Sequence, residues 1–454
     1  MKYADFTIRT RDWQDGQFKV EVTGSPMDRM RDPDCVTYPV ALARPLRNLE
    51  RKRVSPAQLM GLGEALADLL LPPTVRQMLL SSLDGMGAGR GLRLRLVLDD
   101  LRVANLPWEY IHLPRAGSDR AHYGFLALDP RISIVRHEAI PIAPGSVAAR
   151  LPLKLVVGFA SPAEVPPLNL KAERAFIEKA LDGVEGLNVT FVERLTVEKL
   201  ESACRGAHMF HFAGHGGFFW KGGNEAYGSG VIFLEDAAGN NVPLPVENLA
   251  LTLRGAGVRV VVLGGCETGR RDGVNAWSGV APALMRVGIP AAVAMQYSVF
   301  DDAAIAFASR FYQALSAGLS LDEAVMAGRL TILNRGVRDD VDWGVPVLYM
   351  RSADGIVFPE VAADPTLEGL RDRQRVTVWQ RAKELYDELT GVDVIEAPHT
   401  GVEVSQEIAK VAKGGQATGA RIEKLVEGEI RSDQKVDVVG DGGRVTGVSV
   451  RRLG

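Results

Sequence analysis

Between residues 151 and 352, short apolar runs alternate with segments in which apolar residues recur every three or four positions. Such runs predict buried strands, and the three-to-four spacing predicts amphipathic helices. The predicted strands span residues 153–159, 189–192, 209–213, 258–263 and 291–295. The predicted helices span residues 170–181, 197–204, 276–287, 303–316 and 321–334. Because this alternation is typical of βαβ units, we expect a three-layer α/β domain with a mostly parallel central sheet over residues 151–359.

The first 150 residues have a mixed pattern. Residues 92–98 alternate apolar and basic positions, as a half-buried strand does. Residues 126–135 predict a pair of short strands around a proline turn, and the prolines within residues 141–145 then interrupt the pattern. We therefore expect an N-terminal α+β region over residues 1–150, ahead of the α/β domain.

The pattern changes again after residue 359. Residues 367–389 are charged and amphipathic, which predicts a connector helix within residues 360–400. Residues 404–425 then align without gaps with residues 432–453, including a Gly-Gly pair and a Thr-Gly pair in each unit. Gly-Gly between short alternating runs is a hairpin signal, so we expect a small all-β module of two hairpins over residues 401–454. Two such units need a further surface to bury their apolar face, either their own helix or another protein.

Composition narrows the class of protein. The 53 Lys and Arg residues against 56 Asp and Glu residues give a net charge of −3, which provides no overall field for nucleic acid or an anionic membrane. The three cysteines are too few for a disulfide framework or a cysteine-based zinc cluster. The N-terminus is polar, and no apolar run approaches the roughly 20 residues of a membrane span. We expect a cytoplasmic protein with no cofactor or metal and no nucleic-acid or membrane partner.

Two glycine-rich segments follow predicted strands, and each carries one reactive residue type. His215 lies between Gly214 and Gly216, and Cys266 follows a Gly-Gly pair. Two parallel strands would bring His215 and Cys266 to the same edge of the sheet. A thiol becomes nucleophilic at neutral pH beside a base, and imidazole is a base tuned to that range. The backbone amides of Gly216 and Cys266 are candidate oxyanion donors, and the glycines allow close substrate approach.

The same residues also have a purely structural interpretation. A single cysteine after an apolar strand is often a buried small hydrophobe, and glycine-flanked histidines are often structural as well. Cys35 and Cys204 are expected to be structural thiols. A zinc site made of Cys204, His208, His211 and His215 is disfavoured. His208 and His211 would lie on opposite faces of one strand, and Cys204 would end the preceding helix.

Several ordered motifs add to this pattern. They are LPWE at 106–109, IVR at 134–136, HFAGHG at 211–216, LGGCETG at 263–269, GIPAAVAMQYSVFD at 288–301, FYQAL at 311–315 and LDEA at 321–324. Together they resemble the CHAT-domain family, a bacterial branch of the caspase-like cysteine proteases that also includes separase. The resemblance covers roughly residues 90–352. One departure is Gly264–Gly265, where Ser-Ala is commoner before the cysteine.

The resemblance implies a fold and a set of site residues. The fold would be a caspase-like three-layer sandwich, with residues 1–150 as a pseudo-caspase-like half. His215 would be the general base and Cys266 the nucleophile. His211 and Gly214 are expected to pack behind and beside this pair.

Two acidic residues are candidates for the substrate pocket. In separase-like relatives a similarly placed acid faces a basic P1 side chain, and here Asp301 and Asp302 follow the strand after the cysteine strand. A carboxylate in a cleft would pair with Arg or Lys. The alternative is a helix cap or first-turn charge, which fits at least one of the two. Glu267 and Asp272 are weaker candidates for the same pocket.

These inferences favour a cysteine endopeptidase that cleaves one or a few protein targets after a basic residue. The resemblance implies a bacterial defence or cell-death system, with a co-encoded cell-death effector as one substrate and a regulatory or recruiting protein at the C-terminal module. One alternative is a catalytically silent, caspase-like adaptor that acts through that module. Another is a thiol hydrolase acting on a small ester or amide.

Overall fold

A computed structural model provides the structure of the chain. It describes residues 2–27, 32–86, 90–114, 124–137, 149–220, 228–264, 277–297, 299, 301–334 and 341–371, and seven strands between residues 378 and 450.

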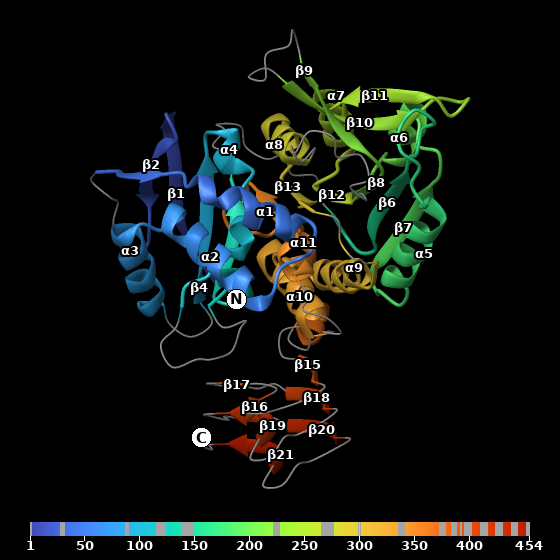
Figure 1. Cartoon of the computed structure of the whole chain (residues 1–454). Coiled ribbons are helices and arrows are strands. Elements are labelled where there is room, and N and C mark those ends of the chain that lie inside the picture. The colour runs from blue at the N-terminus through green and yellow to red at the C-terminus, as the bar shows by residue number, and fades with distance from the viewer. Residues whose placement is uncertain are drawn as a thin grey trace.

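The described part of residues 2–350 is organised around one eleven-stranded sheet (Figure 1). Its strands are β1 (Lys2–Gln14), β2 (Gln17–Gly24), β3 (Asp34–Thr37), β4 (Arg90–Leu98), β5 (Ile132–Arg136), β6 (Leu153–Phe159), β7 (Leu187–Val192), β8 (Met209–Ala213), β12 (Val260–Gly264), β13 (Ala291–Met295) and β14 (Pro346–Met350). Their order is β3-β2-β1-β4-β5-β14-β13-β12-β8-β6-β7. Neighbours are parallel except for β1–β2, β2–β3 and β13–β14, which confirms the mostly parallel sheet.

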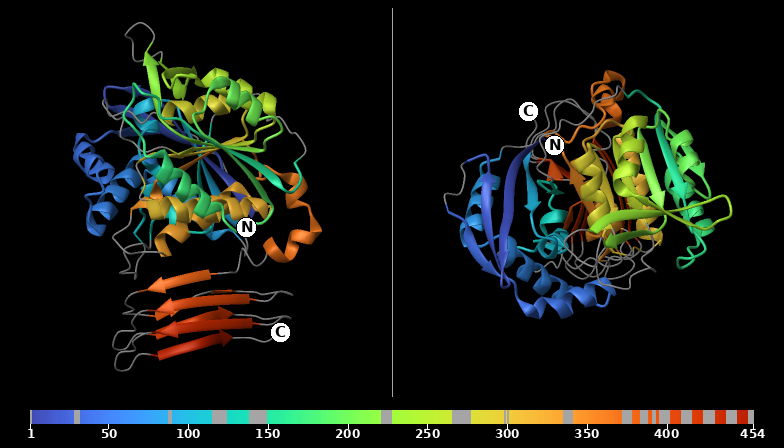
Figure 2. Two further views of the ribbon diagram at one scale, coloured as in Figure 1. Left: turned by 90° about the vertical axis from the view of Figure 1, so that its right-hand side faces the viewer. Right: turned by 90° about the horizontal axis from the view of Figure 1, so that it is seen from above.

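Helices cover both faces of this sheet (Figure 2). They are α1 (Ala43–Glu50), α2 (Pro56–Leu70), α3 (Pro73–Asp84), α4 (Leu101–Ala104), α5 (Leu170–Leu181), α6 (Val197–Ala203), α7 (Val246–Ala256), α8 (Trp277–Val287), α9 (Asp301–Ser316), α10 (Leu321–Asn334) and α11 (Pro359–Ala362). Strand β8 shows how the layers form, because its successive side chains point to opposite faces. Met209 and Ala213 join the core that contains α5, α9 and α10, whereas Phe210 and Phe212 join the core that contains α6, α7 and α8. The three-layer architecture is therefore confirmed.

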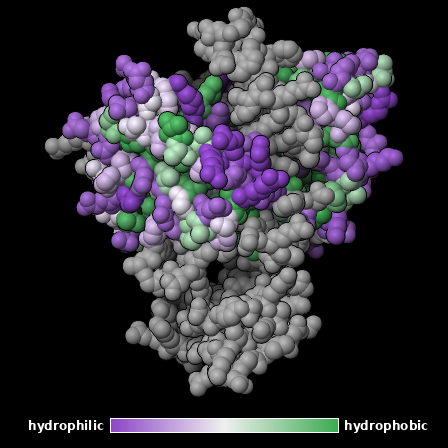
Figure 3. Space-filling model, viewed as in Figure 1, coloured by the Kyte–Doolittle hydropathy of each residue, from purple (hydrophilic) through white to green (hydrophobic). Residues whose placement is uncertain are grey.

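The surface and helices of the described part are those of a globular fold. On the face seen in Figure 3, hydrophilic side chains are interspersed with apolar ones. None of the helices in the described residues is long and apolar enough to cross a membrane.

The N-terminal strands belong to the same sheet as the strands of the α/β domain. The boundary expected at residue 150 falls between β5 and β6 of this one sheet. The strand pair expected over residues 126–135 is wrong in its first half, which is a 3-10 turn at Leu126–Leu128 followed by the single strand β5. The amides of Leu128 and Asp129 donate to carbonyls three residues back, so they are not available to a strand ladder.

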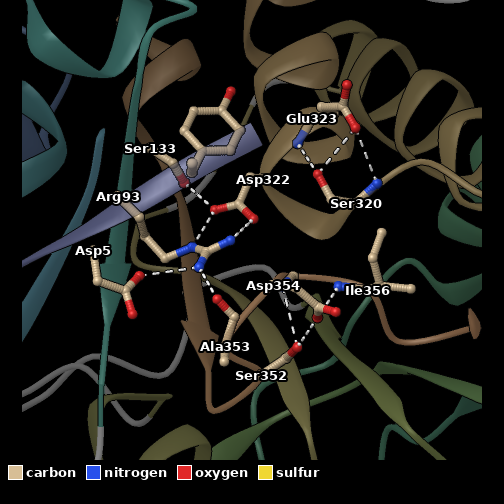
Figure 4. A network of polar contacts seen from close by, with 12 residues as sticks. Asp5, Arg93, Ser133, Ser320, Asp322, Glu323, Ser352, Ala353, Asp354 and Ile356 are labelled. Atoms are coloured by element: carbon tan, nitrogen blue, oxygen red, sulfur yellow. Dashed lines mark hydrogen bonds and ion pairs between the residues drawn. The ribbon is translucent and has the colours of Figure 1, made fainter. Parts of the chain in front are cut away.

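A buried ion pair joins the N-terminal strands to α10 (Figure 4). The Arg93 guanidinium on β4 donates from Nε and Nη2 to the two carboxylate oxygens of Asp322, at 2.9 and 2.7 Å. Ser133 on β5 donates to the same carboxylate at 2.6 Å. Both charged side chains are fully buried. A two-oxygen contact of this kind fixes the position of α10 against the N-terminal strands.

A second, three-stranded sheet follows β8 and was not predicted. It contains β9 (Gly216–Trp220), β10 (Gly228–Glu235) and β11 (Asn241–Pro245), all antiparallel, in the order β11-β10-β9. The first of these strands begins directly after His215, so this sheet lies next to the candidate histidine.

The C-terminal strands form two further sheets, both parallel. The strands are β15 (Val378–Ala382), β16 (Glu388–Thr390), β17 (Asp393–Val394), β18 (Val402–Ile408), β19 (Gln416–Ile422), β20 (Ile430–Val436) and β21 (Arg444–Val450). The order β15-β18-β20 forms one sheet, and β16, β17 and β21 pair with β19 in the other.

This arrangement corrects two predictions. The two hairpins are wrong, because β18 pairs in parallel with β20 and β19 with β21, so each strand pairs with its counterpart in the next unit. A sequence repeat of fixed period stacks in this way when each unit covers the next. The connector helix is also wrong at residues 378–382 and 388–390, which form β15 and β16. Pairing with β18 and β19 overrides the helical spacing of that segment.

Candidate active site

The two strands that precede the candidate dyad are neighbours within the sheet. Ala213, the last residue of β8, pairs in parallel with Gly264, the last residue of β12. His215 follows β8 by two residues, and Cys266 follows β12 by two residues in the sequence. The prediction that these two strands are parallel within one sheet is therefore confirmed, and the structure shows that they are also neighbours. Cys266 itself lies outside the described residues, as do Glu267 and Asp272.

The hydrogen bond of His215 determines which ring nitrogen carries the proton. The side chain is buried, and its Nε2 lies 2.7 Å from the backbone carbonyl oxygen of Pro166. Because a carbonyl oxygen can only accept, Nε2 must carry the hydrogen in the neutral ring. Nδ1 is then the nitrogen with the lone pair, so it is the atom that can take a proton.

Buried polar groups hold the loop that provides the Pro166 carbonyl. Glu235, at the end of β10, accepts from the Ser161 amide at 3.0 Å and from Arg194 Nε at 3.1 Å. The Ser161 hydroxyl in turn accepts from the Leu168 amide at 3.0 Å. The loop is thus anchored on both sides of Pro166. These supporting residues carry no sequence motif, and sequence reasoning missed them.

The glycines beside His215 have different surroundings. A Cβ at Gly214 would lie 2.4 Å from the Phe212 ring and 3.0 Å from the Ala160 carbonyl oxygen, so this glycine is required by packing within the protein. Gly216, whose amide is a candidate oxyanion donor, begins β9 and pairs with Ile232 of β10.

His211 lies behind the site, as predicted for a packed residue. It is buried on β8, and its Nδ1 is 3.0 Å from the Tyr312 hydroxyl on α9. Burial lowers the pKa of His211 to about 4, so the ring is neutral near pH 7. A Cβ at Gly264 would lie 3.0 Å from His211 Nε2. The histidine therefore gives a physical reason for glycine at 264.

The two acidic candidates for the substrate pocket begin α9, six and seven residues after β13. The side chain of Asp301 lies outside what the structure describes. Asp302 is exposed, and its Oδ1 accepts from the Ala303 amide at 3.0 Å. This contact fits the first-turn interpretation for Asp302.

The upstream motifs meet in one buried polar cluster. Glu109 of LPWE accepts from Arg136 Nη2 at 2.8 Å and from Gln296 Nε2 at 3.1 Å. Gln296 also donates to the Gly344 carbonyl at 2.8 Å. Gln296 directly follows β13, so this cluster fixes the start of the segment that leads to α9. Sequence reasoning recognised the motifs but not this contact among them.

Of the other two cysteines, Cys204 is fully buried, and burial raises the pKa of its thiol to about 12. Cys35 is exposed on β3. Cys35 lies on β3, at one end of the sheet order, and Cys204 directly follows α6.

Comparison with solved structures finds distant likenesses. The separase of the Saccharomyces cerevisiae separase–securin complex is 14% identical with a TM-score of 0.33, over 66% of this chain and 17% of that chain. RgpB of Porphyromonas gingivalis, in a complex of its pro- and mature domains, is 12% identical with a TM-score of 0.39, over 65% of this chain and 72% of that chain. Likenesses of this size carry no argument about activity. No curated protein matches the chain.

A family model gives a direct assignment. The CHAT domain model matches residues 61–381, more than half of the chain. The matched range includes the sheet strands from β4 to β14, the upstream cluster and both glycine-rich segments. The chain belongs to the CHAT domain family.

Proposed function

We propose that the protein is a cysteine endopeptidase that uses His215 and Cys266 as a catalytic dyad. The observation that supports this proposal best is the hydrogen bond from His215 Nε2 to the Pro166 carbonyl. It leaves Nδ1 as the basic nitrogen, on a residue that follows the strand next to the cysteine strand.

In the proposed reaction, His215 Nδ1 takes the proton of the Cys266 thiol, and the thiolate attacks the peptide carbonyl carbon. The amides of Gly216 and Cys266 stabilise the resulting oxyanion. The imidazolium then gives its proton to the leaving amine as the C–N bond breaks. Water, deprotonated by His215, attacks the thioester and releases the acid and the free thiol.

For specificity, we propose that the enzyme cleaves after a basic residue, with Asp301 as the carboxylate that pairs with Arg or Lys. Asp301 begins α9, which follows β13, and β13 is the neighbour of β12, the strand that precedes Cys266. This place supports Asp301, whereas the described contact of Asp302 is with the backbone of its own helix. The substrate would be one or a few proteins of a bacterial defence or cell-death pathway in the cytoplasm, with the C-terminal strands recruiting a partner.

The test is cleavage of fluorogenic peptides with Arg, Lys or Asp at P1, and of proteins encoded beside this one. The wild-type chain should cleave after Arg or Lys, whereas Cys266→Ala and His215→Ala should be inactive with unchanged folding. Asp301→Asn should lose the preference for a basic residue, and Asp302→Asn should keep it. Cleavage or toxicity that persists in Cys266→Ala would favour the adaptor alternative.

A further inference from the structure

The C-terminal repeat pairs with itself in a fixed register. Residues 402–408 of β18 lie opposite residues 430–436 of β20, each residue opposite the one 28 positions later. Strand β19 pairs with β21 at the same 28-residue offset, with Thr418 opposite Thr446. What covers the edge of one unit in this chain is therefore the next unit of the same repeat.

Strands β16 and β17 follow the same rule. Glu388 of β16 lies opposite Gln416, and Asp393 of β17 lies opposite Arg421, again 28 positions apart. Thr390 lies opposite Thr418, so the Thr-Gly pair of the repeat also occurs at residues 390–391 of the sequence. Strand β15 differs, because it pairs with β18 at an offset of 26 positions.

The two ends of this stack differ in the described part of the chain. At one end, β15 lies towards the main body and contacts α10 (Figure 1). At the other end, β20 and β21 each pair with a described strand on one side only. An edge of this kind presents backbone amides and carbonyls in the spacing that another strand requires.

The charges at paired positions specify what fits this edge. Glu403 of β18 lies opposite Arg431 of β20, and Glu407 lies opposite Lys435. Neighbouring strands are about 4.8 Å apart, so opposite charges at these positions attract and like charges repel. A strand with acidic residues at its second and sixth positions would therefore complement β20, as β18 does.

We propose that the β20–β21 edge binds one unit of this same repeat from a partner protein, in parallel and in register, with acidic residues opposite Arg431 and Lys435. This inference deepens the recruiting role proposed above. A second copy of this chain is a poorer occupant, because its own free edge strand would bring Arg431 and Lys435 onto the same basic residues.

The test uses a labelled synthetic peptide of residues 402–429 as the probe, titrated into the full Cys266→Ala chain by fluorescence anisotropy. We expect saturable 1:1 binding. A peptide with Glu403→Lys and Glu407→Lys should bind about tenfold more weakly, because two attractive pairs become repulsive. A peptide with Glu423→Lys and Glu427→Lys has the same net charge as the first variant, and both changes lie outside the described strands, so it should bind as the parent does.

A photocrosslinker placed at Gln406 of the peptide tests the register. Crosslinks should fall within residues 430–436 of the chain. The proposal is overturned if the peptide does not bind, if a shuffled peptide binds equally well, if both charge variants lose affinity alike, or if crosslinks fall elsewhere. It is also overturned if the chain alone self-associates and the peptide disperses it. Because the chain used is inactive, none of these outcomes bears on the proposed protease function.

Discussion

Replacing Asp322 with alanine removes the partner of a fully buried guanidinium. Arg93 has no exposed surface, and Asp322 accepts two of its hydrogen bonds, at 2.9 and 2.7 Å. Without Asp322, Arg93 retains Asp5 at 3.1 Å, which is one-third exposed, and the Ala353 carbonyl. Breaking one side of a buried ion pair costs about 3–5 kcal/mol, because the remaining charge stays buried after the loss of its buried partner.

The expected loss is specific to the ion pair rather than to helix formation. The first turn of α10 has its own cap, in which the Ser320 hydroxyl accepts from the Glu323 amide and Glu323 accepts from the Ser320 amide, both at 3.2 Å (Figure 4). This cap is intact in Asp322→Ala. The helix should therefore persist in the folded variant while its attachment to β4 and β5 weakens.

The assay is urea denaturation followed by circular dichroism and by tryptophan fluorescence. Asp322→Ala should lower the free energy of unfolding by about 3–5 kcal/mol. The matched control is Asp99→Ala, which removes an exposed ion pair with Arg9 at 2.8 Å and should cost below about 1 kcal/mol. Equal losses in the two variants, or a loss below about 1 kcal/mol for Asp322→Ala, would refute the buried ion pair as a link between the N-terminal strands and α10.

Three further predictions concern the residues around the site. Burial lowers the pKa of His211 to about 4 from an ordinary value near 6.5, so between these pH values the unfolded chain binds a proton that the folded chain does not. The free energy of unfolding should therefore fall by about 3 kcal/mol as the pH drops from 7 to 4. In pH-dependent denaturation, His211→Gln should show a smaller fall. Gln296→Leu removes one donor to the buried Glu109 carboxylate and should cost about 1–3 kcal/mol in urea; a neutral result would mean that the cluster is not satisfied through this amide. Glu235→Gln loosens the loop that carries Pro166 and should lower kcat on a P1-Arg peptide about tenfold with the fold retained, whereas unchanged kcat would dissociate this loop from catalysis.

Periodicity in the sequence predicted most elements of the α/β domain, but not α7 or β14. The apolar run at 153–159 and the periodic segment at 170–181 match β6 and α5 residue for residue, because fully buried strands and amphipathic helices carry strong local signals. The sheet β9–β11 was missed because it begins in the glycine-rich segment after His215, where no alternation marks a strand. The C-terminal hairpins failed for a related reason, since Gly-Gly pairs mark turns without showing which strands then pair.

The candidate site was predictable only in part. The positions of His215 and Cys266 after two predicted strands follow from local patterns, and β8 and β12 are parallel in one sheet as expected. The group that orients His215 is a backbone carbonyl 49 residues earlier in the chain, and any residue type supplies a carbonyl. Likewise, the contact between Glu109 and Gln296 spans 187 residues, so no local pattern could reveal it.

The dyad of His215 and Cys266 is the central claim, and alkylation of Cys266 measures it without knowledge of the substrate. Iodoacetamide is added across pH 5–9, and Cys266, Cys35 and Cys204 are quantified separately by peptide mass spectrometry, which makes the exposed Cys35 an internal reference. A base beside the thiol should make Cys266 react at pH 6.5 at least about tenfold faster in the wild-type chain than in His215→Ala. Equal pH profiles of Cys266 alkylation in the two chains would contradict the dyad.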